Sequence, residues 1–172
     1  MNDNIKVLIS QGKIEARIQE MADEISAEYS DKGVHLICIL KGSVFFMCEL
    51  AKRLTCPTTM DFICTSSYGD GTQSSGIVKF SKDLDESIEG KHCIVIEDIL
   101  DSGRTLHYVI GVLEGKNPAS LKIITLLDKP DRRVVQVDLD MTGFVVPDKF
   151  IVGYGLDYAQ KYRNLPYIGV IE

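Results

Sequence analysis

Apolar residues recur along the chain in two patterns: short continuous runs, and positions spaced three or four residues apart. Short β-branched runs are typical of buried strands, and the wider spacing is typical of a helix with one buried face. The runs predict strands over 34–40, 60–67, 93–96, 121–127, 150–154 and 167–171. The wider spacing predicts helices over 11–29, 44–54 and 106–113, with inward positions Ile14, Ile18, Met21, Ala22, Ile25, Tyr29, Val44, Met47, Leu50, Ala51, Leu54, Leu106, Val109, Ile110 and Leu113.

Strands and helices alternate through the first three quarters of the chain. This order indicates a parallel sheet whose strands are joined by helical crossovers. Beyond residue 127 the character changes, because 134–140 alternates apolar and polar residues, and Pro147 and Asp148 interrupt the chain before the next strand. We therefore predict an α/β fold with a central, mainly parallel, twisted sheet flanked by helices.

The segment 92–106 carries the strongest chemical signal. Its pattern predicts a strand, a loop containing Ser102 and Gly103, and the start of a helix. Three carboxylates follow the strand directly: Glu97, Asp98 and Asp101. A helix that begins at the end of a strand presents unpaired N–H groups and a positive dipole end, which suit a phosphate. The carboxylates must then face sugar hydroxyls, a metal ion or a proton to be removed, so a sugar phosphate fits.

Composition limits the classes of protein to consider. The chain has 172 residues, enough for one domain with a core, and is 45% apolar and 26% charged. No apolar run has the length of a membrane span, and the first residues lack the order of a signal peptide, so we expect a cytoplasmic protein with no membrane partner. A net charge of −6 argues against nucleic acid as a partner. It also means that a polyphosphate ligand would bring a counterion, for which we expect Mg²⁺.

The cysteines show no spacing that suits a zinc site. Their number is odd, none forms a C-x-x-C pair, and several lie within apolar runs: Cys38, Cys48, Cys56, Cys64 and Cys93. This placement predicts reduced thiols in the core, without disulfides.

The segment 94–105, Ile-Val-Ile-Glu-Asp-Ile-Leu-Asp-Ser-Gly-Arg-Thr, resembles the phosphoribosyl-diphosphate (PRPP) binding motif of the type I phosphoribosyltransferases. In that motif apolar residues lead into two acids, two apolar residues, Asp, Thr or Ser, Gly, any residue and Thr. The Glu-Asp form of the acid pair is similar to the hypoxanthine-guanine branch. The alternative is an acidic loop after a core strand, as in a doubly wound receiver-like domain.

A second segment, 147–158, is similar to the hypoxanthine-guanine enzymes in particular. These enzymes have a small hood over the purine, in which an aromatic matching Phe150 stacks on the base and the Ile151 backbone contacts its edge. The resemblance implies that Lys129 donates to the exocyclic oxygen of the purine. It also implies that Asp157 reaches Mg²⁺ through water and borders the base, and that Arg163 contacts pyrophosphate.

The resemblance divides the chain into a core at about 30–145 and a hood formed by the N-terminal residues and about 146–172. Residues 66–77, rich in glycine and small polar side chains, match the family's flexible loop, with Ser67 and Tyr68 at its start. We expect this loop to act as a lid that excludes water from the reacting centre, although a plain linker between two hairpin strands is the ordinary alternative.

The phosphate-binding residues implied by the resemblance come from two loops. Backbone N–H groups of 101–105, with the hydroxyls of Ser102 and Thr105, would bind the 5′-phosphate, while Arg104 occupies the variable position of the motif. Lys41 and Gly42 follow another predicted strand, and the Leu40–Lys41 peptide of the family can be cis, with its N–H turned toward pyrophosphate. A plain turn with Lys41 in solvent is the alternative for this segment.

The implied reaction is transfer of the 5-phosphoribosyl group of PRPP to N9 of hypoxanthine or guanine, releasing pyrophosphate. Asp101 would accept or donate the proton at purine N7, and Glu97 and Asp98 would bind the ribose hydroxyls and the metal. Two alternatives are a xanthine-preferring enzyme and a non-catalytic sensor of PRPP or nucleotide on the same fold. The family implies a homodimer or homotetramer.

Overall fold

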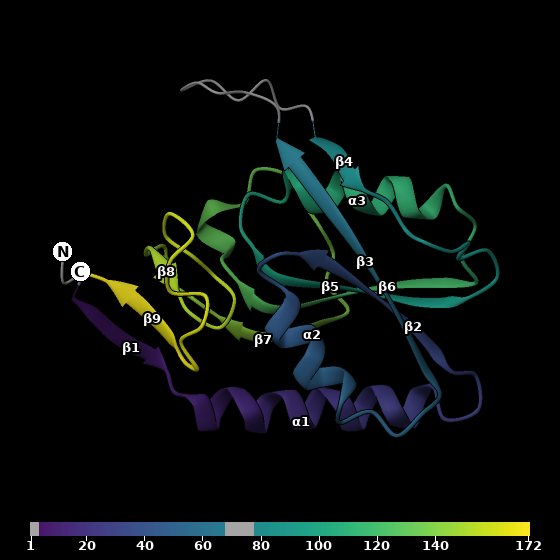
Figure 1. Ribbon diagram of the computed structural model, residues 1–172, viewed down its shortest axis with the longest axis horizontal. Coiled ribbons are helices and arrows are strands. Elements are labelled where there is room, and N and C mark those ends of the chain that lie inside the picture. Colours follow the sequence, from purple (N-terminus) through teal and green to yellow (C-terminus); the bar gives the residue numbers. More distant parts are fainter. Residues whose placement is uncertain (1–3, 68–77) are drawn as a thin grey trace.

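The structure is a computed structural model that describes residues 4–67 and 78–172 (Figure 1). Within these residues the helices are α1 (Gln11–Glu28), α2 (Val44–Ala51) and α3 (Arg104–Glu114), with a 3₁₀ turn η1 (Pro130–Arg132). The strands in the same ranges are β1 (Ile5–Ile9), β2 (Val34–Leu40), β3 (Thr58–Ser67), β4 (Val78–Lys82), β5 (His92–Leu100), β6 (Ser120–Asp128), β7 (Met141–Val145), β8 (Ile151–Val152) and β9 (Ile168–Ile171).

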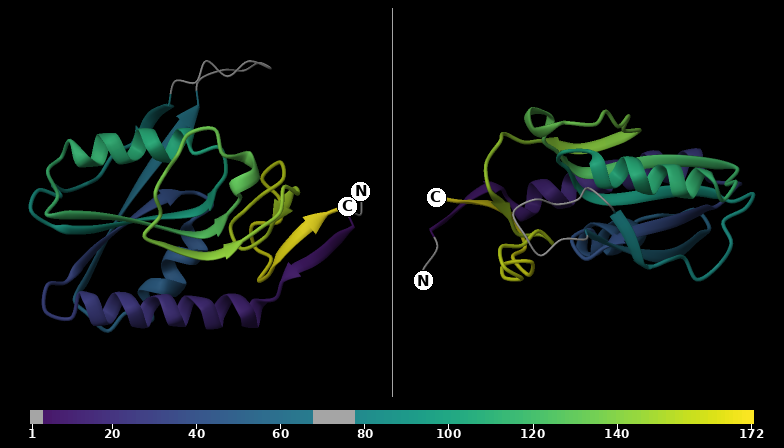
Figure 2. Two further views of the ribbon diagram at one scale, coloured as in Figure 1. Left: turned by 180° about the vertical axis from the view of Figure 1, so that it is seen from behind. Right: turned by 90° about the horizontal axis from the view of Figure 1, so that it is seen from above.

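The described strands form a six-stranded sheet in the order β4-β3-β2-β5-β6-β7. Its neighbours pair in parallel except for β3 with β4. Successive residues of β2 and β5 point to opposite faces. On one face Leu36 and Ile94 pack with α1 and α2, and on the other Ile37 and Val95 pack with the apolar stripe of α3. Figure 2 shows these helices on the two sides of the sheet, as predicted for an α/β fold.

A small sheet forms beside this core from the two ends of the described chain, in the order β1-β9-β8. All of its pairs are antiparallel, and Ile5 faces Ile171 across the outer pair. The loop between β8 and β9 packs against the loop that follows β2, because a Cβ on Gly155 would lie 1.8 Å from the carbonyl oxygen of Gly42. This contact brings segments more than 100 residues apart to one place.

The main strands and helices lie where the sequence predicts them, with differences at the edges. The alternating segment 134–140 is not a strand, since the N–H groups of Val134 and Val135 both donate to the Ser102 carbonyl rather than to a neighbouring strand. The strand after it is β7, which the pattern missed because its side chains are only partly buried. β1 was missed for the same reason, as three of its five residues are exposed.

The cysteines are all free thiols, as expected. Cys38, Cys56 and Cys93 are buried, and burial raises the pKa of Cys38 to about 12, which makes its thiol unreactive. Cys48 is an exception to the predicted core placement, because it lies on the exposed side of α2. No helix in the described part of the chain has both the length and the apolar character needed to cross a membrane.

His35 makes the stability of the fold sensitive to acid. Its side chain is buried in β2, and its Nδ1 lies 2.7 Å from the Thr59 hydroxyl. Burial, assisted by Lys91, lowers the pKa of His35 from its ordinary 6.5, although Asp61 and Glu86 act in the opposite direction. A lowered histidine pKa gives stability above pH 6.5 that is lost as the pH falls toward the folded-state value.

We therefore expect wild type to lose more unfolding free energy than His35→Gln between about pH 7.5 and about pH 5.5. Urea denaturation at each pH measures this difference. His107→Gln, at an exposed position of α3, is the control and should follow the wild-type pH profile. Parallel profiles for wild type and His35→Gln would contradict the assignment.

Candidate active site

Loops from three neighbouring strands meet at one edge of the large sheet. β2, β5 and β6 are adjacent and parallel, so their carboxyl ends lie together, where open α/β sheets bind ligands. A cavity of about 310 Å³ opens there. It is lined by Ile39, Leu40, Lys41, Gly42, Thr65, Glu97, Asp98, Ile99, Leu100, Asp101, Ser102, Gly103, Thr105, Leu106 and Arg163. We call it the sugar-phosphate cavity.

Two adjacent carboxylates, Glu97 and Asp98, form its acidic wall. The hydroxyl of Ser43 donates to Glu97 Oε1 over 2.8 Å and accepts the N–H of Asp98 over 2.9 Å. Burial, followed by the charge of Asp98, raises the pKa of Glu97 well above its ordinary 4.5, and burial also raises the pKa of Asp98. The wall therefore favours a proton or another positive charge. Ser43 is fully buried and was missed by sequence reasoning, although it directly follows Lys41 and Gly42.

Gly42 permits this arrangement by having no side chain. A Cβ at this position would lie 1.6 Å from Asp98 Oδ2, which no side chain could tolerate without displacing the carboxylate. The preceding Leu40–Lys41 peptide is cis, the alternative that the sequence left open. Lys41 itself is exposed, and its Nζ lies 3.4 Å from Gln160 Oε1 in the loop between β8 and β9.

The opposite wall is the loop 101–105, which we call the phosphate loop. Its last two residues are the first of α3, and Gly103 caps the helix with a left-handed φ of 84°. Ser102 and Thr105, the residues predicted to bind the 5′-phosphate, line the cavity. Arg104 does not line it: the side chain is exposed, and its backbone N–H lies 3.4 Å from the Ser102 hydroxyl.

Arg163 reaches the cavity from the loop between β8 and β9. Its Nη1 donates to the Gly155 carbonyl over 2.7 Å, and its Nη2 lies 2.7 Å from Asp157 Oδ1. Asp157 does not line the sugar-phosphate cavity, and its other carboxylate oxygen accepts the Gln160 N–H. The structure thus joins Asp157 to the site through Arg163.

A second cavity, of about 460 Å³, adjoins the first. Its lining residues come from the ends of β5 and β6 and from the segment around β8: Ile99, Asp101, Lys129, Arg132, Asp148, Lys149, Phe150, Ile151 and Leu156. We call it the base cavity. Lys129 is 8% exposed, and its Nζ donates to the Lys149 carbonyl over 2.9 Å. Phe150 is 54% exposed and contacts Tyr158 edge to face, which leaves ring surface available for stacking.

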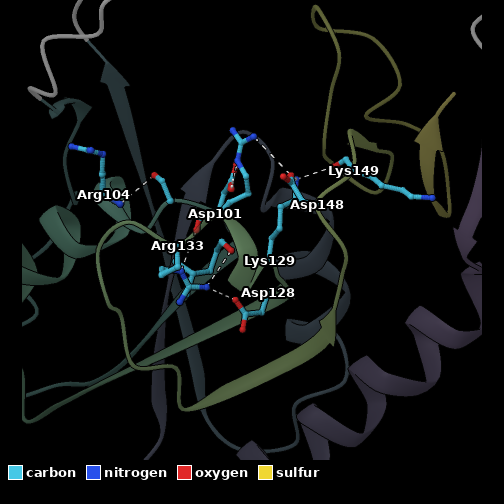
Figure 3. Close-up of polar contacts among 10 residues, drawn as sticks. Asp101, Arg104, Asp128, Lys129, Arg133, Asp148 and Lys149 are labelled. Atoms are coloured by element: carbon cyan, nitrogen blue, oxygen red, sulfur yellow. Dashed lines mark hydrogen bonds and ion pairs between the residues drawn. The ribbon is translucent and has the colours of Figure 1, made fainter.

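Asp101 and Ile99 line both cavities, so Asp101 stands between them. Within the described residues, Asp101 Oδ1 is buried without a hydrogen-bond donor. Arg132 Nε lies 3.6 Å from it, and Arg132 Nη1 lies 3.8 Å from Asp148 Oδ1. Figure 3 shows this side of the site, with Asp101, Lys129 and Asp148 labelled. Arg132 and Asp148 were not among the predicted site residues, because charges in a polar turn suggest ordinary surface positions.

The predicted lid lies almost wholly outside the described residues. Ser67 is the last residue of β3, and Tyr68 and the remainder of the loop fall in 68–77.

Residues 6–159 match the family model described as the phosphoribosyl transferase domain. The match covers most of the chain and includes the strand ends that line the two cavities. The chain belongs to the phosphoribosyl transferase family. The predicted family is therefore confirmed.

Named relatives are similar to this chain over nearly its full length. It is 49% identical to the hypoxanthine-guanine phosphoribosyltransferase of Bacillus subtilis over 99% of this chain and 95% of that protein. A hypoxanthine phosphoribosyltransferase structure from Staphylococcus aureus superposes with a TM-score of 0.94 at 43% identity, covering 99% of this chain and 93% of that one. The bifunctional protein TilS/HprT of Listeria innocua is 50% identical over 99% of this chain, which spans only 26% of that longer protein.

The Gly42–Asp98 contact predicts a sharp difference between two glycines. Gly42→Ala should abolish ligand binding and lower the free energy of unfolding, because the new Cβ must displace the buried carboxylate. Gly12→Ala, in the first turn of α1 with nothing within 4 Å of a Cβ, is the matched control and should not lower the free energy of unfolding. Urea denaturation and PRPP titration measure the two effects. Wild-type PRPP affinity in Gly42→Ala would show that the contact does not constrain the site.

The raised pKa of Glu97 predicts that the acidic wall costs stability. A carboxyl whose folded pKa lies above the unfolded value loses stability as the pH rises from about 4.5 through the folded-state value. Glu97→Gln should therefore be more stable than wild type at pH 8 in EDTA, with the gain shrinking as the pH falls toward 4.5. Melting temperatures across this range measure it. A gain that stays constant with pH would exclude titration of Glu97 as its cause.

Proposed function

We propose that the protein catalyses purine salvage, by transferring the 5-phosphoribosyl group of PRPP to N9 of hypoxanthine or guanine and releasing pyrophosphate. The single observation that carries the proposal is the placement of Asp101, which lines both the sugar-phosphate cavity and the base cavity. A reaction that joins a sugar to a base needs the two bound side by side with a proton acceptor at their junction. The relatives named for this activity support the choice of substrates.

The sugar-phosphate cavity has groups that could bind both the 5′-phosphate and the pyrophosphate of PRPP. Backbone N–H groups of the phosphate loop and the start of α3, with the hydroxyls of Ser102 and Thr105, would bind the 5′-phosphate. Arg163 and the Lys41–Gly42 backbone would bind the pyrophosphate. The charge of the leaving group is thus met by groups already in place, which lowers the barrier to its departure.

The acidic wall suits Mg²⁺ as a companion of the substrate. Among the described residues no group of three or more potential ligands gathers, which fits a metal that keeps several waters and is held by one or two carboxylates and substrate phosphates. Burial raises the pKa values of Glu97 and Asp98 although the charge of Arg163 acts the other way on Asp98, so a further positive charge beside the wall would be favourable. We assign Glu97, Asp98 and, through water, Asp157 to the metal, which when bound would neutralise charge on pyrophosphate.

The base cavity would hold the purine between an aromatic ring and polar edges. Phe150 offers a stacking surface, Ile151 offers backbone groups, and Lys129 is a buried donor suited to the exocyclic oxygen of hypoxanthine or guanine. Stacking tolerates any purine, so discrimination rests on the hydrogen-bonding edge. Residues 146–172 and the N-terminal strand would act as the hood, and 66–77 as the lid.

The function is tested by pyrophosphate release from PRPP with hypoxanthine, guanine, xanthine, adenine or orotate offered singly, each with and without Mg²⁺. We expect metal-dependent release with hypoxanthine and guanine. A preference for xanthine would keep the mechanism and overturn the base assignment. Binding of PRPP or nucleotide without release for any base would favour a non-catalytic sensor.

Asp101 is the proposed acid–base residue for the proton at purine N7. Asp101→Asn keeps the shape of the side chain but cannot accept the proton, so kcat should fall by about 10² to 10⁴ while PRPP affinity changes little. Steady-state kinetics and a PRPP titration measure both values. Wild-type turnover in Asp101→Asn would remove this assignment.

We also propose that the protein acts in the cytoplasm as a homodimer or homotetramer, as the family resemblance implies. Its free cysteines fit a reducing compartment. Size-exclusion chromatography with light scattering tests the assembly, and a monomer at working concentrations would contradict it.

A further inference from the structure

The carbonyl groups of Leu100 and of the first two residues of the phosphate loop accept hydrogen bonds from residues 128–135, which we call the backing segment. The Lys129 N–H donates to the Leu100 carbonyl over 3.0 Å. Arg133 Nε donates to the Asp101 carbonyl over 3.1 Å. The N–H groups of Val134 and Val135 both donate to the Ser102 carbonyl over 2.9 Å. Three consecutive carbonyls therefore point toward one segment.

The directions of these carbonyls also determine where the neighbouring N–H groups point. In a planar trans peptide the C=O of one residue and the N–H of the next point in opposite directions. Carbonyls of 100, 101 and 102 that point toward the backing segment leave the N–H groups of 101, 102 and 103 facing away from it. Residues 101–103 all line the sugar-phosphate cavity on that other side.

Arg133 is the one side chain among these donors. It is 14% exposed, its Nη2 also lies 3.5 Å from the Leu100 carbonyl, and it forms a close ion pair with Asp128 at the end of β6 (Figure 3). Asp128 is in register with Leu100 across the β5–β6 pair. The ion pair therefore holds the arginine to β6, next to the end of β5 whose carbonyls it binds. A Cβ on Gly103 would lie 2.2 Å from the Val135 carbonyl, so the two segments are in close contact.

We propose that Arg133 is a positioning residue for the proposed reaction: through the Asp101 and Leu100 carbonyls it holds the phosphate loop so that its N–H groups face the 5′-phosphate. The inference rests on the proposed function, because it takes residues 101–105 as the phosphate-binding loop. Arg133 lines neither cavity and acts only through the backbone. Its guanidinium spans two carbonyls and a carboxylate, which a lysine cannot do.

The test compares Arg133→Ala, Arg133→Lys and Asp128→Asn with wild type. Displacement of binding groups by about 1 Å can cost about 100-fold, so kcat/KM for PRPP should fall by about 100-fold in Arg133→Ala. Arg133→Lys should recover part of this loss, and Asp128→Asn should show a smaller loss. The KM for hypoxanthine should change less than twofold, because the base cavity does not use these N–H groups.

Arg17 provides the matched control. It also pairs with a carboxylate, at 2.8 Å from Glu20, and donates to a backbone carbonyl, over 2.9 Å to Thr142 on β7. Its side chain is 26% exposed, and it lies outside both cavities. Arg17→Ala and Arg17→Lys should lower the melting temperature without changing either substrate's constants.

Ribose 5-phosphate, titrated calorimetrically, separates the inference from the proposed function. If wild type binds this probe but releases no pyrophosphate, the proposed catalysis fails, and selective loss of the probe in Arg133→Ala still supports the positioning role. Wild-type affinity for the probe and wild-type kinetics in Arg133→Ala would overturn the inference. An equal loss for both substrates that follows melting temperature, as a purely structural arginine would give, would overturn it as well.

Discussion

The parallel pairing of β5 with β2 on one side and β6 on the other fixes the whole site. Its register sets Cys38 opposite Ile96 and Leu100 opposite Asp128, so that the three strands end at neighbouring levels. The loop after β2 then delivers a hydroxyl to the acid pair, and the segment after β6 binds the carbonyls of the phosphate loop. A slip of one residue in either pairing would turn these groups to the opposite face of the sheet.

Close backbone contacts then join the small sheet to this edge. Gly155, with a φ of +101°, packs on the Gly42 carbonyl, and Gly42 in turn packs on the Asp98 carboxylate. Each contact requires a missing side chain. The loop that carries Arg163 is therefore connected directly to the acidic wall, and the two sheets form one site although each has its own strands.

The acid pair of this site lowers the stability of the free protein. Glu97 and Asp98 lie together where burial opposes their charge, yet the Ser43 hydroxyl and two backbone N–H groups keep them oriented. Such a pair is costly in the free protein and favourable only with a positive charge beside it. Arg132, close to Asp101 and Asp148, gives the base cavity a cation of its own.

The sequence by itself determined the α/β alternation, the main strands and helices, and the run from Glu97 to Thr105, because periodic burial and contiguous motifs are local properties. The edge strands β1 and β7 were not predicted, because half-exposed strands show little periodicity of apolar residues in the sequence. Tertiary structure alone decided that Ser43 supports the acid pair, that Arg132 lines the base cavity, and that Arg133 lies behind the phosphate loop. A serine in a turn and arginines after a strand have no local signal of their partners. Their contacts arise only when parallel strands bring distant loops to one edge of the sheet.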